Sequence, residues 1–350
     1  MDRHALPDPR HFRMPAEWAR HRGTVLTWPH RPGIWRGVHD EVEALFAQLA
    51  AELSEVEEVH LNVPDRVWRE RAAALARAAG ADDKQLIWHE NDSDDVWARD
   101  HGPLFVAARA DAPVGTSPLA MLDFAFNAWG GKFAAALDDQ IPRKMNAFFG
   151  LPRIEPGLVM EGGSLEVNGQ GDLLTTESVL LHTNRNPDHD RTAIADCLAL
   201  HLGVERLHWL GGGLEGDDTD GHIDDMARFV DPRTIVVVCP QKGHPDYDVM
   251  AENLVRMQSF QTAGGGAFEV VTLPCPEPIS FADEHLPASY ANFYIANDKV
   301  LVPVFDQPGD AEALGILQAL MPDRRVIGLD ARALVTQYGG IHCVTQQIPA

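Results

Sequence analysis

Chemically distinctive loops recur along this chain at nearly constant intervals. Each lies between predicted strands, and their marker residues stand 53 to 68 positions apart: Trp35, Asp100, Glu161, His222, Tyr290 and Cys343. A period of this length, with strands and one helix in each unit, is typical of a repeat architecture whose equivalent loops fall on one face. Five such units closed into a ring would bring five loops to one central cleft. An ordinary α/β chain with a chance spacing of loops is the alternative.

The periodicity of apolar residues supports alternating strands and helices. Apolar residues recur at helical spacing over 38–54, and Asn168-Gly169 is a strong two-residue hairpin signal between two predicted strands. The predicted helices are 38–54, 64–79, 138–149, 186–202, 246–262 and 308–321. The predicted strands include 56–63, 85–89, 104–107, 121–126, 173–181, 206–210, 226–230, 234–239 and 268–273.

Length and charge restrict the class of protein. The 350 residues, 45% of them hydrophobic, suffice for two ordinary domains or one large one, and we expect a single catalytic domain over 1–350. A net charge of −23 would repel nucleic acid and anionic membranes and attract a small cation. Segment 1–13 has no apolar core of a signal peptide, and no run is long enough to span a membrane, so we expect a cytoplasmic protein.

The four cysteines are scattered along the chain. Cys197, Cys239, Cys275 and Cys343 form no CxxC pair, so their linear spacing indicates neither a disulfide framework nor a cysteine zinc site. Cys343 is distinctive because it follows a glycine turn and precedes a short β-prone run, where a sharp bend can present a thiol to a cleft. The alternative is that Cys343 packs in the core without a chemical role, because free cysteines are often buried.

The acidic loop around His222 permits a metal site. Its hard ligands are Asp217, Asp218, Asp220, His222, Asp224 and Asp225. An EF-hand would need acidic residues where the chain has Gly216 and Ala227, and no HExxH motif occurs. Ser164 lacks the second glycine of GxSxG, and the glycines near 170 lie in a hairpin, so a serine hydrolase and a dinucleotide fold are disfavoured. A metal-dependent hydrolase stays open as an alternative.

A cysteine nucleophile acting on a cationic substrate accounts for more of these loops. The thiolate is the reactive form and needs a nearby cation at neutral pH. A guanidinium is such a cation, and Asp100 and Asp224 are suited to grip its planar fork. His222 precedes Asp224 by two residues, so in an extended segment both side chains face one side, where His222 can protonate departing ammonia and later activate water.

Six motifs extend this pattern from about Met14 to Pro349. They are Trp97-Ala98-Arg99-Asp100-x-Gly102-Pro103, Glu161-Gly162-Gly163-Ser164, Thr183-Asn184-Arg185-Asn186-Pro187, Asp218-Thr219-Asp220-Gly221-His222-Ile223-Asp224, Ser289-Tyr290-x-Asn292-Phe293 and Ile341-His342-Cys343-Val344-Thr345-Gln346-Gln347. Together they resemble the agmatine deiminase family of guanidine-modifying enzymes, also called penteins. The resemblance implies an α/β fold, a five-bladed α/β propeller with pseudo-fivefold repeats of strands plus one helix.

The resemblance also implies an activity, the hydrolysis of agmatine to N-carbamoylputrescine and ammonia without a metal or another cofactor. By matching position, Cys343 would be the nucleophile that forms an S-alkylthiouronium intermediate. His222 would be the general acid and base, and Asp100 and Asp224 would clamp the guanidinium. The partners implied are a small cationic guanidinium substrate and, as a homodimer, a second copy of the chain.

The same resemblance assigns further residues to the substrate site. Trp97 and Glu161 would line it, with Trp97 against the aliphatic part of the substrate, and Asp218 would face the distal amine. Asp218 stands where the family has Glu, and Gly340 stands where it has Asn, so another guanidine such as arginine or a longer amine is an alternative substrate. A binding protein without turnover is a further alternative.

Two residues beside the predicted catalytic ones are expected to support the site. Adjacent residues of a strand point to opposite faces, so we expect a structural role for His342, next to Cys343. By the same argument Arg99, next to Asp100, is expected to be a buried ion-pair partner.

Overall fold

One arrangement of strands and helix recurs through the chain. The computed structural model describes residues 7–350, so residues 1–6 of the predicted N-terminal segment lie outside it. In four sheets an antiparallel pair is followed by a helix and a third strand parallel to the second. The first unit consists of β5 (Leu104–Ala108), β6 (Leu119–Leu122), α5 (Ile141–Phe149) and β7 (Arg153–Ile154), and the second of β8 (Glu166–Val167), β9 (Asp172–Thr176), α7 (Arg191–Leu202) and β10 (Arg206–Leu210). The third unit consists of β11 (Ala227–Asp231), β12 (Thr234–Val238), α8 (Tyr247–Ser259) and β13 (Glu269–Leu273). The fourth consists of β16 (Tyr294–Ala296), β17 (Lys299–Val304), α9 (Gly309–Leu320) and β18 (Arg325–Asp330).

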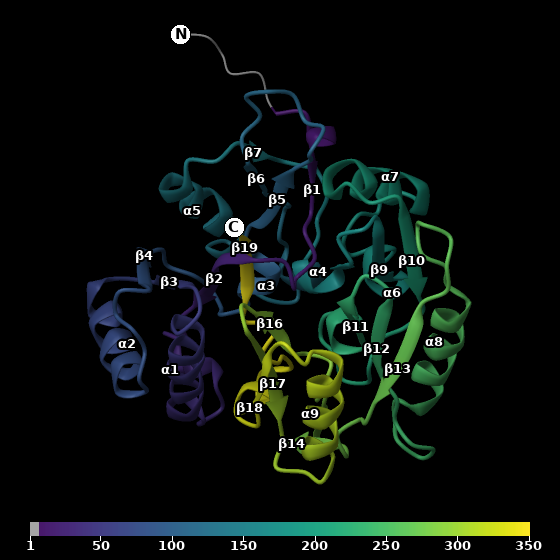
Figure 1. Ribbon diagram of the computed structural model, residues 1–350. Coiled ribbons are helices and arrows are strands. Elements are labelled where there is room, and N and C mark those ends of the chain that lie inside the picture. The colour runs from purple at the N-terminus through teal and green to yellow at the C-terminus, as the bar shows by residue number, and fades with distance from the viewer. Residues whose placement is uncertain (1–6) are drawn as a thin grey trace.

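The two ends of the chain build a fifth sheet of the same pattern. The last strand, β19 (Gln346–Pro349), pairs antiparallel with β2 (His21–Thr27), and α1 (His39–Ser54) leads to the parallel strand β3 (Glu58–Val63). A further helix, α2 (Arg66–Ala78), leads to β4 (Leu86–Glu90). The C-terminal strand therefore joins the N-terminal part of the chain, and in Figure 1 it lies near the centre of the molecule.

The helices cover the outside of these sheets. In Figure 1, α1, α2, α5, α7, α8 and α9 lie at the periphery. Local signals explain two of their ends: the Asp190 side chain accepts from Ala193 N at the start of α7, and Gly203 ends it in the left-handed region with φ 66°. Strand β12 is buried along its whole length, which explains its continuous run of Thr-Ile-Val-Val-Val.

The remaining elements are short. The first strand, β1 (Phe12–Arg13), pairs with β5, and a separate hairpin is formed by β14 (Ile279–Phe281) and β15 (Glu284–Leu286). One-turn helices are α3 (Ala98–His101), α4 (Ala128–Gly131) and α6 (Glu177–Leu180), with 3₁₀ turns at η1 (Pro9–His11), η2 (Pro32–Ile34), η3 (Asp138–Gln140), η4 (Gly162–Ser164), η5 (Ile223–Asp225) and η6 (Leu334–Gln337). Within residues 7–350 no helix combines the length and apolar composition needed to cross a bilayer.

The predicted α/β alternation is confirmed, and several boundaries differ. The predicted strand 173–181 ends at Thr176, because Glu177 begins a helical turn that leads into a loop. The helix predicted over 186–202 begins only at Arg191, where Asp190 supplies the cap. Strand β18 was not predicted; it is the edge strand of its sheet, only one of its residues is buried, and it contains Gly328, so it lacks a clear apolar pattern.

Candidate active site

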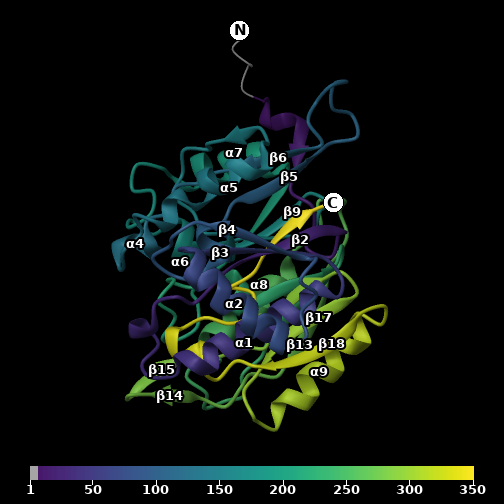
Figure 2. The ribbon, with the colours of Figure 1, turned by 90° about the vertical axis from the view of Figure 1, so that its left-hand side faces the viewer.

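A cavity of about 360 Å³ opens beside Cys343. Its walls include the aromatic side chains of Trp97, Trp129 and Phe133 and the carboxylates of Asp95, Asp100 and Asp218. The lining segments come from distant parts of the chain. In Figure 2, α4, which carries the lining residue Trp129, and the β14–β15 hairpin lie on the same side of the molecule. A partly apolar, acid-lined cavity of this size suits a small organic cation.

Cys343 lines this cavity from the turn before β19 and is 5% exposed. Its sulfur accepts a hydrogen bond from Asn292 Nδ2 at 3.1 Å and lies 3.9 Å from Asp224 Oδ2. Asn292 Oδ1 in turn accepts from the amides of His342 and Cys343, at 2.9 and 3.3 Å. One asparagine therefore holds both the backbone and the thiol of this turn.

Asp224 is fully buried and is positioned by His342. The Nδ1 atom of His342 lies 2.6 Å from Asp224 Oδ2, and its Nε2 atom lies 2.7 Å from Glu17 Oε2. Burial acts to raise the pKa of Asp224, but the hydrogen bond and charge of His342 outweigh it and lower this pKa below its usual range. No group of residues 7–350 hydrogen bonds Asp224 Oδ1, which leaves one carboxylate oxygen for a ligand.

Asp100 lies on the one-turn helix α3 and is held by two donors. Trp129 Nε1 donates to Oδ2 at 2.9 Å, and the amide of Gly163 donates to Oδ1 at 3.0 Å. A Cβ atom at position 163 would lie 2.8 Å from Asp100 Oδ1 and 2.5 Å from His222 Nδ1, so only glycine fits between them. Burial raises the pKa of Asp100 to about 6.

His222 lies behind Asp100, between two carboxylates. Its Nδ1 atom is 3.7 Å from Asp100 Oδ1 and its Nε2 atom is 3.8 Å from Glu161 Oε2, so these are ion pairs rather than direct hydrogen bonds. Glu161 is itself held by Arg185 at 2.6 Å. Burial acts to lower the pKa of His222, but the negative charges of Asp100, Glu161 and Asp224 raise it to about 10. The imidazole therefore carries a proton at neutral pH.

The surroundings that favour the charged form of His222 disfavour the charged form of Cys343, the thiolate. Burial, followed by the charges of Asp224, Asp225 and Asp100, raises the pKa of Cys343 well above its usual range. The same carboxylates would attract a cation into the space beside the sulfur. The site is thus arranged so that a positively charged ligand must arrive before the thiolate is favoured.

The structure brings together the residues predicted from the sequence. Cys343, Asp100, Trp97 and Asp218 line the cavity, while His222, Asp224 and Glu161 lie behind it, fully buried. Trp97 packs beside Trp35, with ring centroids 6.4 Å apart, and a Cβ atom at Gly339 would lie 2.2 Å from its ring. Asp218 is half-buried, and burial raises its pKa.

Comparison with known proteins agrees with this geometry. Residues 13–349 match the family described as Porphyromonas-type peptidyl-arginine deiminase. An agmatine deiminase of Ectopseudomonas mendocina is 36% identical over 97% of this chain and 96% of its own length. This chain belongs to the agmatine deiminase family. A member from the plant Medicago truncatula is 34% identical over 97% of this chain and 96% of its own length.

Solved structures of agmatine deiminases have the same fold. The agmatine deiminase of Enterococcus faecalis superposes with a TM-score of 0.89 at 30% identity, covering 99% of this chain and 98% of its own. An agmatine deiminase of C. jejuni with substrate bound superposes with a TM-score of 0.87 at 29% identity, covering 97% and 96%. The mixed α/β fold is therefore of the pentein type, as predicted for an agmatine deiminase family member.

In this agmatine deiminase family member the acidic loop around His222 does not act as one ligand cluster. Asp217 accepts from the amides of Thr219 and His222, and Asp220 pairs with Lys132 and Arg185. These carboxylates are occupied in shaping the loop. Asp224, Asp225 and Cys343 do lie close enough to share an ion, with one donor atom each within 4.8 Å of the others.

The support predicted for the site is partly confirmed. Arg99 is buried and pairs with Glu17 at 3.1 Å, as predicted, but it lies on the helix α3 rather than in a strand. His342 contacts Asp224 directly, and it lies in a turn, so the strand argument used for it was wrong. The β-prone run begins only at Gln346, after Cys343.

Several residues of this agmatine deiminase family site were not assigned from the sequence. Asn292 lies in one of the six motifs, but its contact with the Cys343 thiol was not predicted. Trp129, which holds Asp100, and Glu17, which holds His342, lie far from the predicted loops in sequence. An unusual buried Glu near the N-terminus gives no signal until its partners are known.

Proposed function

We propose that this protein is an agmatine deiminase that converts agmatine and water into N-carbamoylputrescine and ammonia, without a metal or another cofactor. The observation that carries the proposal is that Cys343 lines an acid-lined cavity, with its thiol 3.9 Å from Asp224 and with Asp100 on the same cavity. His222 lies 3.7 Å from Asp100. These are the groups that hydrolysis of a guanidinium by a nucleophilic cysteine requires.

Asp100 and Asp224 are proposed to hold the guanidinium. The free Oδ1 atom of Asp224 accepts one edge of the planar cation, and Asp100, fixed by Trp129 and Gly163, accepts another. A cation held on two edges keeps its central carbon still for attack. Burial and the neighbouring carboxylates suppress ionisation of Cys343, and the charge of the substrate offsets these carboxylates, so the thiol releases its proton to solvent as the substrate binds.

The first half of the reaction forms a covalent intermediate. The thiolate of Cys343 bonds to the guanidinium carbon, and the carbon–nitrogen π electrons move to nitrogen. His222, protonated in the resting site, gives its proton to one amino group, and the carbon–nitrogen bond breaks to release ammonia. The product on the enzyme is a positively charged S-alkylthiouronium attached to Cys343.

The second half releases the ureido product. Neutral His222 takes a proton from water as the water oxygen bonds to the thiouronium carbon. The carbon–sulfur bond then breaks, the hydroxyl proton leaves to solvent, and the thiolate of Cys343 and the protonated imidazole are restored. Glu161 keeps His222 charged and oriented through their ion pair at 3.8 Å.

The rest of the cavity is proposed to bind the butylamine part of agmatine. Trp97 lies against the methylene groups, and Asp218, on the cavity wall, attracts the distal ammonium. Glu161 contributes to the site through its ion pair with His222.

The wider assembly is part of the same proposal. We infer a five-bladed α/β propeller over residues 1–350 as one catalytic domain, supported by the five sheets of one pattern and by the pairing of β19 with β2. A cytoplasmic homodimer that does not bind nucleic acid is also inferred. Light scattering of the purified protein tests the dimer.

The activity is tested by incubating the purified protein with agmatine and assaying ammonia and the ureido product. We expect equal amounts of the two products. Protein quenched with acid during turnover is expected to show the mass of one thiouronium adduct on the peptide that contains Cys343. Retained activity in Cys343→Ala would overturn the mechanism, and bound agmatine without ammonia would indicate a binding protein.

Another guanidine is the second candidate substrate, because the matching family description names peptidyl-arginine and because Asp218 is shorter than the Glu expected there. A panel of agmatine, arginine and arginyl peptides, ranked by kcat/KM, separates these candidates. We expect agmatine to rank first, since the carboxylate of an amino acid would meet an acid-lined wall. Loss of activity with a chelator and its rescue by metal would instead favour a metal-dependent hydrolase.

A further inference from the structure

A second cavity of about 360 Å³ lies where the parallel strands β12 and β13 end. Cys239 follows β12 directly, and Cys275 follows β13 by two residues, so the parallel pairing brings these cysteines to one edge. Both line this cavity together with His244. The tertiary structure thus gathers thiols that are 36 residues apart in the sequence, and they are not part of the proposed active site.

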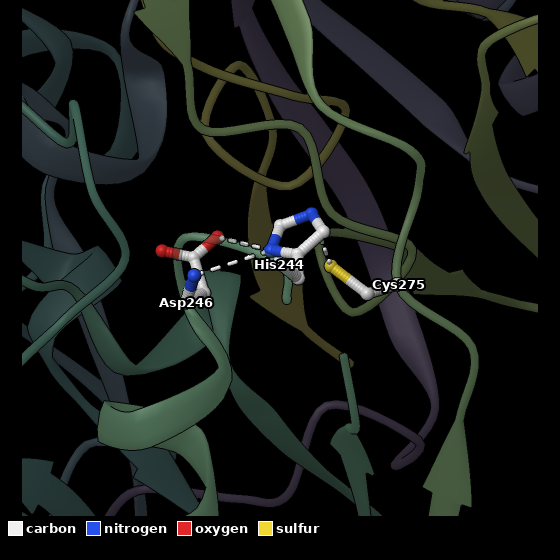
Figure 3. Close-up of side chains that lie close together, drawn as sticks. All are labelled: His244, Asp246 and Cys275. Carbon is white, nitrogen blue, oxygen red and sulfur yellow. Dashed lines mark hydrogen bonds and ion pairs between the residues drawn. The ribbon is translucent and has the colours of Figure 1, made fainter. Parts of the chain in front are cut away.

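The side chains around this cavity have the spacing of metal ligands. The Sγ atom of Cys275 lies 3.8 Å from His244 Nε2, close to the distance of about 3.6 Å between a thiolate and an imidazole that share a tetrahedral zinc. His244 lies between Cys275 and Asp246, as Figure 3 shows, and Asp246 Oδ2 is 3.4 Å from His244 Nδ1. One donor atom from each of the three falls within 4.8 Å of the others.

We propose that this cluster is a binding site for a thiophilic divalent cation such as Zn²⁺, with Cys275 and His244 as ligands, Cys239 as a further thiol on the same cavity wall, and Asp246 as the residue that positions His244. A carboxylate on the far nitrogen of a ligating imidazole is the arrangement found in many metal sites. The mixture of thiolate and imidazole selects zinc-like ions over Mg²⁺ or Ca²⁺.

The charge balance at this cluster favours a cation. Asp246 is only 3% exposed, and within residues 7–350 its sole ion-pair partner is His244. Its other oxygen, Oδ1, accepts from the amide of Glu215 at 2.6 Å, so Oδ2 is the oxygen that faces His244. Lys242 and Glu277 also line the cavity, and their charges oppose one another.

Metal binding requires protons to move. Without metal, His244 Nδ1 lies 3.2 Å from the Asp246 amide and Nε2 lies 3.1 Å from the Pro276 carbonyl, so Nε2 carries the proton. Coordination through Nε2 moves this proton to Nδ1, where Asp246 Oδ2 accepts it. A cysteine binds Zn²⁺ as the thiolate, so coordination by Cys275 also releases its thiol proton to solvent. Affinity is therefore expected to rise with pH.

The cluster is joined to the loop that carries proposed catalytic residues. Asp246 holds the amide of Glu215, which lies three residues before Asp218 and seven before His222. A bound ion would fix Asp246 through His244 and restrain this loop. We expect Zn²⁺ to raise the melting temperature of the protein, because an ion that binds only the folded state stabilises it.

The proposal is tested with Co²⁺, whose thiolate complexes absorb in the near ultraviolet and whose tetrahedral complexes absorb visible light. The full-length Cys343→Ala protein, reduced and stripped with a chelator, is titrated so that the active-site thiol cannot contribute. We expect one Co²⁺ per chain, both absorption bands, and displacement by Zn²⁺. Cys275→Ser and His244→Ala in this background should abolish binding, and Asp246→Asn should weaken it about 10- to 100-fold.

Cys197 supplies the matched control, because its thiol also lies beside an imidazole, 3.5 Å from His201 Nδ1, but within residues 7–350 no third donor completes this Cys–His pair as Asp246 completes the pair of Cys275 and His244. Cys197→Ser should leave the Co²⁺ spectrum unchanged. Absence of the bands in the Cys343→Ala protein, or bands that survive both Cys275→Ser and His244→Ala, would overturn the proposal.

A second measurement avoids variants that fail to fold. In the natural protein, kept reduced, Zn²⁺ should slow alkylation of Cys239 and Cys275 by iodoacetamide and leave Cys197 unaffected, as read by peptide mass spectrometry. Equal alkylation rates of Cys239 and Cys275 with and without Zn²⁺ would reject the site.

Discussion

At the scale of single residues, the proposed chemistry depends on charges that are unfavourable until the substrate arrives. Burial opposes ionisation of Cys343, and the charges of Asp224, Asp225 and Asp100 add to its effect. Asp100, Glu161 and Asp224 keep His222 protonated. A bound guanidinium favours ionisation of Cys343 and makes His222 a readier proton donor, because it neutralises the carboxylates while it brings the reacting carbon to the sulfur. The resting enzyme is therefore expected to react slowly with neutral alkylating reagents at Cys343.

The raised pKa of Asp100 predicts an acid limit to activity. Burial raises this pKa to about 6, and a protonated Asp100 cannot clamp a cation. As pH falls below about 6, kcat/KM for agmatine should fall about tenfold per unit, since this parameter reports groups of the free enzyme. Steady-state rates between pH 4.5 and 8 measure the limb. The substrate does not titrate there, so a midpoint near 4 would show that Asp100 is not the controlling group.

Gly339 is expected to be essential for the cavity wall. A Cβ atom there would lie 2.2 Å from the Trp97 ring, so Gly339→Ala must displace the ring that is proposed to contact the substrate. We expect kcat/KM to fall at least tenfold, a loss of about 1.4 kcal/mol in transition-state binding. Gly33→Ala is the matched control, because Gly33 lines the same cavity but its Cβ position has no neighbour within 4 Å. Equal effects of the two changes would contradict the argument.

At the scale of elements, three segments meet at the rim of the cavity. Arg36 follows the turn η2, Glu284 begins β15, and Tyr338 follows η6. Arg36 Nη1 donates to Glu284 at 2.7 Å, Arg36 Nη2 donates to the Tyr338 hydroxyl at 2.9 Å, and that hydroxyl donates to Glu284 at 2.6 Å. Arg36 and Tyr338 line the cavity, so this cluster links the β14–β15 hairpin to its wall.

Weakening the cluster of Arg36, Glu284 and Tyr338 should affect substrate binding more than the stability of the protein. Glu284→Gln removes the charge that Arg36 contacts, and because the cluster is exposed the melting temperature should hardly change. We expect KM for agmatine to rise about two- to tenfold, with a smaller difference at high salt, where the wild-type pair is screened. Glu252→Gln, which removes an exposed pair with Arg256 on α8, is the control and should leave KM unchanged. An unchanged KM in Glu284→Gln would show that this cluster does not affect substrate binding.

At the scale of the whole molecule, Glu17 connects four segments. Its Oε1 atom accepts from Arg228 at 2.8 Å and from the Ile295 amide at 2.8 Å, and its Oε2 atom contacts Arg99 at 3.1 Å and His342 at 2.7 Å. These partners lie on β11, β16, α3 and the Cys343 turn. One buried carboxylate therefore joins sheets from both halves of the chain beneath the proposed site.

Removal of this charge should be costly. Glu17→Gln leaves two buried arginines short of a counter-charge, and breaking a buried ion pair typically costs about 3–5 kcal/mol of unfolding free energy. Urea unfolding at pH 7 measures the loss. Asp83→Asn, which breaks an exposed pair with Arg77, is the control and should cost less than about 1 kcal/mol. Comparable losses in the two variants would show that Glu17 is not a central connection.

The local pattern of residues predicted much of the fold. Apolar periodicity places α1, the Asn168-Gly169 turn places the β8–β9 hairpin, and glycines 150 and 203 end α5 and α7 with positive φ. These signals succeed because helix periodicity, hairpin turns and left-handed caps depend on neighbouring residues. The regular spacing of the loops also indicated which ones could converge on Cys343.

The sequence by itself determined the alternation of strands and helices, the loops that carry Cys343, His222, Asp100 and Asp224, and the family to which they point. Only the tertiary structure decided that Asn292 holds the thiol, that Glu17 joins four segments, and that Cys239 and Cys275 share a cavity. The physical reason is distance along the chain. Caps and turns are encoded within a few residues, whereas a buried charge or a metal ligand is recognisable only beside partners that packing supplies.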